Sequence, residues 1–177
     1  MSDREIRELG KRVDALLEAK CRLEAIDVLQ DHMGLVEQDF ELSWNLGWTF
    51  FKQDDLARAT LHLARAVSLA PARPVGHWAL GIVLAEKGDF KEAEAAYLTS
   101  LTLKDSSLAR LGLGYLYQQQ GQLEEAENVH LEGIRLKPTD KERIEAYADF
   151  LSDVGRETEA QVQYERAAQV AGNEGTS

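Results

Sequence analysis

The side chains best able to do chemistry in this sequence are four histidines and one cysteine. They are His32, His62, His77, His130 and Cys21. The histidines are scattered, and none has the H-E-x-x-H or Cys/His spacing with which neighbouring side chains bind zinc. Lys20 and Arg22 flank Cys21 and would lower a thiol pKa, but a small residue packed between two helices is the simpler interpretation. No phosphate-binding loop or nucleophile elbow is present, so the sequence predicts no enzyme activity, no metal and no cofactor.

A second set of reactive side chains is a row of carboxylates near the C-terminal end. The row consists of Glu142, Glu145, Asp149 and Asp153. On a helix these positions share one face. Carboxylates one helical turn apart seldom close a cation site. Two interpretations therefore remain: a surface that binds a basic partner, or a solvated polar face.

The tryptophans form a third pattern. Trp44, Trp48 and Phe51 share one face of a predicted helix, and Leu46 and Phe50 occupy another. A soluble helix that is apolar on two faces is either enclosed or binds a partner. The aromatic residues are therefore either anchors for another protein or packing between neighbouring helices.

Composition limits the partners. The chain has 177 residues and a net charge of -11, which argues against binding to a phosphate backbone or to anionic lipid. Its first residues carry charge where a secretory signal has an apolar core. No apolar run approaches the roughly 18 residues of a membrane span. The sequence predicts a soluble cytoplasmic protein without nucleic-acid or membrane partners.

The elements that would position these side chains recur along the sequence. Gly47, Gly81 and Gly114 are 34 and 33 residues apart. The same intervals separate three further columns: Leu46, Leu80, Leu113 and Tyr147; Ala59, Ala93, Ala126 and Ala160; and Leu63, Tyr97, His130 and Tyr164. Several columns in one register indicate a true repeat.

Each repeat is predicted to form two amphipathic helices. The helices are separated by a glycine that can end a helix in the left-handed conformation, as at Gly88, Gly121 and Gly155. The Gly47 column has a physical reason, because two antiparallel helices at close range leave no room for a side chain.

These columns resemble the tetratricopeptide repeat. The residues that match its pattern in the second repeat are Leu46, Gly47, Phe50, Ala59, Leu63, Ala66 and Pro71. In the next repeat Asp105 stands where the pattern has Pro. The resemblance implies an all-α, right-handed superhelical solenoid of about five antiparallel helix pairs. The expected array spans residues 1–174, with repeats at 6–39, 40–73, 74–106, 107–140 and 141–174 and a disordered tail at 175–177.

In that family, fixed positions of each first helix face a concave groove. Carried over, these positions imply a partner-binding groove of Trp44, Asn45, Trp48, Phe51, Lys52, Trp78, Ile82, Leu111, Tyr115, Glu145, Asp149 and Asp153. A subgroup of the family clamps a C-terminal carboxylate. Asn45 matches one clamp position, but Val75 and Ala79 stand where the clamp needs Lys and Arg, which argues against that role.

The resemblance implies a non-enzymatic adaptor or scaffold that binds a partner peptide or helix in its concave groove. The matching segment has apolar anchors, with a basic end if the acidic row takes part. Two alternatives remain open, namely a small secretion-type chaperone that shields a client protein and a permanent structural subunit of a larger complex. The repeat pattern identifies the fold, but it says almost nothing about which ligand is bound.

Overall fold

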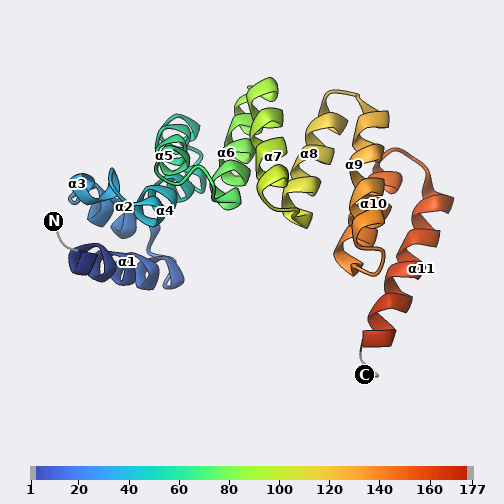
Figure 1. The fold of residues 1–177 in the computed structure, drawn as a ribbon, viewed down its shortest axis with the longest axis horizontal. Helices are drawn as coiled ribbons and strands as arrows, with labels where there is room; N and C mark the ends of the chain where they lie inside the picture. The colour runs from blue at the N-terminus through green and yellow to red at the C-terminus, as the bar shows by residue number, and fades with distance from the viewer. Residues whose placement is uncertain (1–2, 175–177) are drawn as a thin grey trace. The chain divides into compact units, whose positions relative to one another are not determined.

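The computed structural model describes residues 3–174, with side chains described as far as residue 171, and within this range every regular element is an α-helix. Consecutive helices fold back on each other in pairs (Figure 1). The all-α fold of paired helices is therefore confirmed. The predicted tail at 175–177 lies outside the described residues. Within the described part of the chain, no helix combines the length and apolar composition needed to cross a bilayer.

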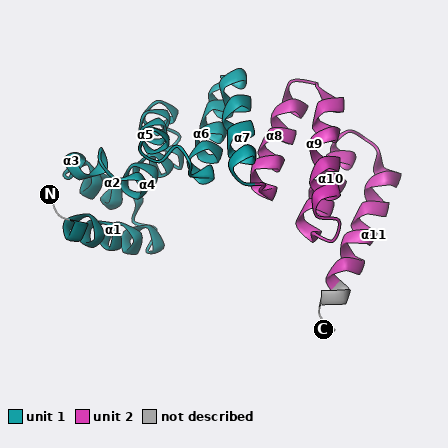
Figure 2. Cartoon of the chain, in the orientation of Figure 1, with its two compact units in different colours: residues 1–104 teal, residues 105–177 magenta. Residues whose placement is uncertain are grey.

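The chain divides into two compact units (Figure 2). Unit 1, residues 1–104, contains α1 (Asp3–Glu18), α2 (Arg22–Gln30), α3 (Met33–Val36), α4 (Phe40–Phe51), α5 (Leu56–Leu69), α6 (Pro74–Lys87) and α7 (Phe90–Leu103). Unit 2, residues 105–177, contains α8 (Ser107–Gln119), α9 (Leu123–Leu136), α10 (Lys141–Asp153) and α11 (Glu157–Glu174). A single array of five repeats stays a prediction.

The glycine column lies where the paired helices approach most closely. A Cβ atom added at Gly47 would lie 2.9 Å from the backbone nitrogen of Leu63. The same atom at Gly81 would lie 2.9 Å from the Tyr97 ring, and at Gly114 it would lie 2.7 Å from Nε2 of His130. These distances are shorter than a van der Waals contact, so only glycine fits. Each glycine faces its counterpart in the column of Leu63, Tyr97 and His130.

Backbone conformations at the turns repeat with the same period. Gly88, Gly121 and Gly155 have φ angles of 83°, 71° and 79°, which is the left-handed conformation expected for helix-ending glycines. Lys20 and Asp54 adopt φ angles of 60° and 61° in the turns between α1 and α2 and between α4 and α5. The turn therefore keeps its shape in the first two helix pairs, even though no glycine is present there.

The N-terminal segment contains one element more than a simple helix pair. Val13, Ala25 and Leu29 are fully buried in unit 1, as expected for a repeat. The short helix α3 then precedes α4, and its Val36 is also fully buried. Before α3, the His32 ring donates a hydrogen bond from Nδ1 to the Val28 carbonyl oxygen at 2.7 Å. Residues 33–36 are thus anchored to the core rather than forming an open loop.

Candidate protein-binding surfaces

Four aromatic side chains from α4 and α6 lie together in unit 1. We call this group, Trp44, Trp48, Phe51 and Trp78, the aromatic cluster. The ring centroid of Trp48 is 5.6 Å from that of Trp44, 5.1 Å from that of Phe51 and 5.5 Å from that of Trp78. All four side chains are half-buried and pack against the core of unit 1. They therefore contribute to packing and still present part of their surface to solvent.

Polar groups border the aromatic cluster. The Lys52 ammonium lies 4.9 Å from the Trp48 ring centroid, which is a cation–π distance. Asn45 donates a hydrogen bond from Nδ2 to Asp14 Oδ1 at 3.4 Å. The indole nitrogen of Trp44 is buried and has no hydrogen-bond partner among the described residues. Ile82, the remaining predicted groove residue of unit 1, is half-buried on α6.

In unit 2, α8 presents a row of exposed apolar side chains. Leu111 and Tyr115 are 46 % and 54 % exposed, and Leu108, one turn before Leu111, is 56 % exposed. Three large apolar side chains in succession on one exposed helix face are unusual unless something binds them. We call Leu108, Leu111 and Tyr115 the α8 row.

The three predicted acidic residues of α10 all have partners within unit 2. Glu145 pairs with Lys141 at 3.3 Å. Asp149 accepts a hydrogen bond of 2.6 Å from the Tyr164 hydroxyl, which raises the pKa of Tyr164 to about 12. Asp153 accepts a hydrogen bond of 3.2 Å from the side chain of Gln118. These contacts are exposed, so a basic partner and a solvated face both remain compatible with them.

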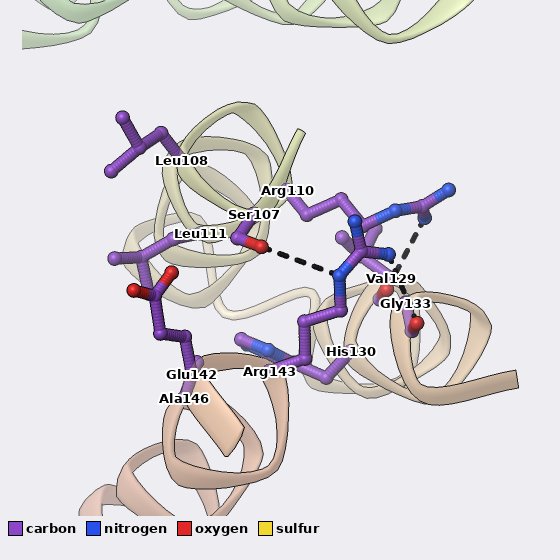
Figure 3. A pocket seen from close by; sticks show the side chains of 10 residues that line it. All are labelled: Ser107, Leu108, Arg110, Leu111, Val129, His130, Gly133, Glu142, Arg143 and Ala146. Carbon is purple, nitrogen blue, oxygen red and sulfur yellow. Dashed lines mark hydrogen bonds between the residues drawn. The ribbon is translucent and has the colours of Figure 1, made fainter. Parts of the chain in front are cut away.

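A pocket of about 280 Å³ lies between α8, α9 and α10. Figure 3 shows Leu108 and Leu111 from α8 and Glu142 from α10 on one side of it. The Arg143 side chain reaches across from α10 towards Ser107, and His130 of α9 also borders the space. We call this space the α8–α10 pocket.

Arg143 is the best-buried charged residue at this pocket, with a side chain 3 % exposed. It donates hydrogen bonds from Nη2 to Asp105 Oδ2 at 2.6 Å and from Nη1 to the Gly133 carbonyl oxygen at 3.0 Å. Its Nε donates to the Ser107 hydroxyl at 3.3 Å and lies 3.2 Å from Asp140 Oδ2. Every nitrogen of this guanidinium therefore has an acceptor.

Asp105 holds two arginines together. Its second carboxylate oxygen accepts a 2.6 Å hydrogen bond from Nε of Arg110. Burial opposes ionisation of Asp105, but the hydrogen bonds from Arg143 and Arg110 outweigh burial and hold the pKa of this carboxyl below its usual value. Asp105 and Asp140 together balance the charges of the two arginines. The only sequence signal for this network is that Asp105 stands where Pro71 and Pro138 stand in other repeats.

His130 is buried against aromatic side chains. Its ring lies 5.3 Å from the Phe150 ring and 6.2 Å from the Tyr147 ring. Burial lowers the pKa of His130 to about 4, and the nearby carboxylates Asp149 and Glu127 offset only part of that effect. The ring is therefore neutral at pH 7 and acts as a packing residue.

The depressed pKa of His130 predicts a pH-dependent loss of stability. An unfolded chain takes up this proton near pH 6.5, and the folded chain only near pH 4, so stability falls as the pH drops from 6.5 towards 4. The full shift corresponds to about 3 kcal/mol, and we expect about 2 kcal/mol because the ring borders a pocket. Urea unfolding at a series of pH values between 7 and 4 measures the slope of the free energy of unfolding against pH.

The control for this experiment is His130→Leu, because Leu63 fills the same column in unit 1. The variant should lose the part of the slope due to His130 and keep the part due to His62, whose pKa burial also lowers. An unchanged slope would mean that His130 takes up its proton equally in the folded and unfolded chain.

The repeat pattern identifies the class of the protein. The family model described as tetratricopeptide repeat matches residues 45–107 and 78–141, together more than half of the chain. The chain therefore belongs to the tetratricopeptide repeat family. This fold implies a scaffold for protein–protein interaction, and members of the family are generally non-enzymatic.

Solved structures show the same fold at low sequence identity. The protein MamA, residues 41 to the end, from Desulfovibrio magneticus RS-1 superimposes with a TM-score of 0.76 at 17 % identity, covering 98 % of each chain. PilF of Pseudomonas aeruginosa gives a TM-score of 0.77 at 18 % identity, covering 95 % of this chain and 77 % of its own. No curated protein sequence matches the chain. These similarities are evidence for the fold alone.

Proposed function

We propose that the protein is a cytoplasmic adaptor or scaffold that binds a peptide or helical segment of another protein. The binding surface is the first-helix face of its repeats. The aromatic cluster carries this proposal, because Trp44, Trp48 and Trp78 come from the first helices of two consecutive pairs and form one continuous set of ring contacts. Large aromatic side chains that are partly exposed and held rigidly are typical anchors of protein recognition.

The α8 row supports the same proposal independently. Its leucines and tyrosine occupy first-helix positions of unit 2 and are about half exposed. A partner that covered the exposed half of these side chains would remove apolar surface from water and gain free energy.

Replacing Trp48 by alanine tests the proposal. A partner recovered by affinity purification and identified by mass spectrometry is titrated against the wild-type protein and the variant. We expect Trp48→Ala to weaken binding by about 2 kcal/mol, because an anchor of this kind is worth about 1–4 kcal/mol at an interface. The free energy of unfolding of each variant is measured in parallel.

Leu61→Ala serves as the control, since Leu61 is 65 % exposed on the second helix α5. It should leave binding unchanged. If Trp48→Ala unfolds the protein, the tryptophan belongs to the core. If the fold and binding both survive, the partner docks on another face. The recovered complex also distinguishes the adaptor from the two alternative functions. A permanent subunit of a larger complex would stay bound on dilution, and a chaperone would bind its client in an unfolded state.

A further inference from the structure

We infer that the α8–α10 pocket receives one bulky apolar side chain of the partner, and that Lys or Arg adjoins this side chain in the partner's sequence. The inference rests on the proposed function and adds the chemistry of the bound segment. Size, lining and charge each support it.

One repeated column that lines the pocket changes size along the chain. Residues 44, 78, 111 and 145 share this column at intervals of 34, 33 and 34 residues. In unit 1 the column holds Trp44 and Trp78, which pack against the core with their rings. In α8 the same position is Leu111, which is smaller and borders the pocket. Leu111 therefore leaves more room beside α8 than a tryptophan in the same column would.

The size of the pocket suits a single side chain. At about 280 Å³ it lies just below the range of about 300–1,000 Å³ that is typical of sites for whole small molecules. Leu108, Leu111, Val129 and Ala146 give it mainly apolar walls. An aromatic or large aliphatic side chain fits such walls better than a polar ligand does.

The charges at the pocket disfavour an anionic occupant. Arg143 and Arg110 border it, but Asp105 and Asp140 neutralise both, and each nitrogen of the Arg143 guanidinium already has an acceptor. An incoming carboxylate or phosphate would have to displace these bonds. The interior is thus electrically balanced and holds no free cation at Arg143.

The rim, in contrast, carries an unpaired negative charge. Glu142 is exposed, lines the pocket and makes no ion pair or hydrogen bond with the described residues. Further along α10, Asp149 and Asp153 accept hydrogen bonds from the neutral side chains of Tyr164 and Gln118. A partner residue beside the inserted side chain therefore meets the Glu142 carboxylate, which favours Lys or Arg at that position.

The experiment uses a phage-displayed library of random 12-residue peptides, selected on the full-length wild-type chain and depleted on the Leu111→Trp variant. That variant places in α8 the residue of the Trp44 column and is designed to fill the pocket from Leu111. We expect the surviving peptides to share Trp, Phe or Leu next to Lys or Arg. Failure to recover any peptide, or a consensus without this pairing, would overturn the inference.

A synthetic peptide of the recovered consensus is then titrated by fluorescence polarisation. We expect Leu111→Trp, and Ala146→Leu as a second filling variant, to raise the Kd about 10-fold or more. Glu142→Gln should raise it about 2- to 5-fold at low salt. The matched controls Leu131→Trp and Glu124→Gln change a leucine 44 % exposed and an exposed carboxylate on α9. Both controls should bind as the wild type does.

The same titration with Trp48→Ala separates the two proposals. If Trp48→Ala weakens peptide binding and neither filling variant does, the proposed function is supported and the inference about the pocket is overturned. Binding that none of these variants changes would overturn both. Light scattering of the wild type and of Leu111→Trp provides a further check on the occupant. If the wild type is a dimer and Leu111→Trp is a monomer, a second copy of this chain occupies the pocket, and the inference of a basic partner segment is overturned.

Discussion

Replacing Asp105 by alanine should lower the free energy of unfolding by about 3 kcal/mol. The change would leave the buried Arg143 without its shortest acceptor and Arg110 without its carboxylate partner. Removing one partner of a buried ion pair costs about 3–5 kcal/mol. We expect the lower end, because Asp140 remains 3.2 Å from Arg143 Nε and Asp105 is partly exposed. Urea unfolding followed by circular dichroism measures the loss.

The matched control is Asp89→Ala, which removes an exposed carboxylate paired with Lys87 and should cost less than about 1 kcal/mol. Equal losses for the two variants would contradict a structural role for the network. The pH dependence gives a second check. Because the pKa of Asp105 is held below its ordinary 3.8, its contribution is complete above that pH and is lost as the pH falls below it.

Gly81→Leu should cost about 3 kcal/mol or more. Even a Cβ atom at this position would lie 2.9 Å from the ring of Tyr97, so a whole leucine has to push α6 and α7 apart. Overpacking of a well-packed core costs about 1–3 kcal/mol and occasionally more. The change should appear as a lower midpoint of urea unfolding.

Gly10→Leu is the control for this prediction. Gly10 lies inside α1, and a Cβ atom there would have no neighbour within 4 Å. Leucine forms helices better than glycine does, so this variant should be neutral or slightly more stable than the wild type. If Gly81→Leu has the midpoint of the wild type, the close approach of α6 and α7 is absent in solution.

The repeat made the packing of the helix pairs predictable from sequence. Positions that recur every 33 or 34 residues are expected to contact equivalent neighbours in each repeat. The structure shows this contact between the glycines and the second-helix residues, in the pairs Gly47–Leu63, Gly81–Tyr97 and Gly114–His130. The short helix α3 could not be predicted in this way, since residues 67–69 and 101–103, at the same place in the next two repeats, continue the longer helices α5 and α7. Lys20 and Asp54 also gave no sign of their left-handed backbone, which is ordinarily a glycine conformation.

The surfaces were predictable only in part. Helical spacing placed Trp44, Trp48 and Phe51 on one face, but spacing does not tell how deeply a side chain is buried. The network around Asp105 lay beyond prediction, because its partner Arg143 is 38 residues away and the pairing depends on side-chain reach. Likewise, nothing in the row of α10 acids indicated that Tyr164 would donate a hydrogen bond to Asp149.

The aromatic cluster also gives the molecule a built-in optical probe. The chain has three tryptophans, and all of them belong to this cluster in unit 1. Emission excited at long ultraviolet wavelength therefore arises from unit 1 alone, while unit 2 contributes only tyrosine. The Trp48 ring on α4 and the Trp78 ring on α6 are 5.5 Å apart, which is close enough to couple electronically, so small movements of α4 against α6 should alter the spectrum. A label-free fluorescence trace thus follows one half of the chain, and comparison with far-ultraviolet circular dichroism distinguishes melting of that half from melting of the whole.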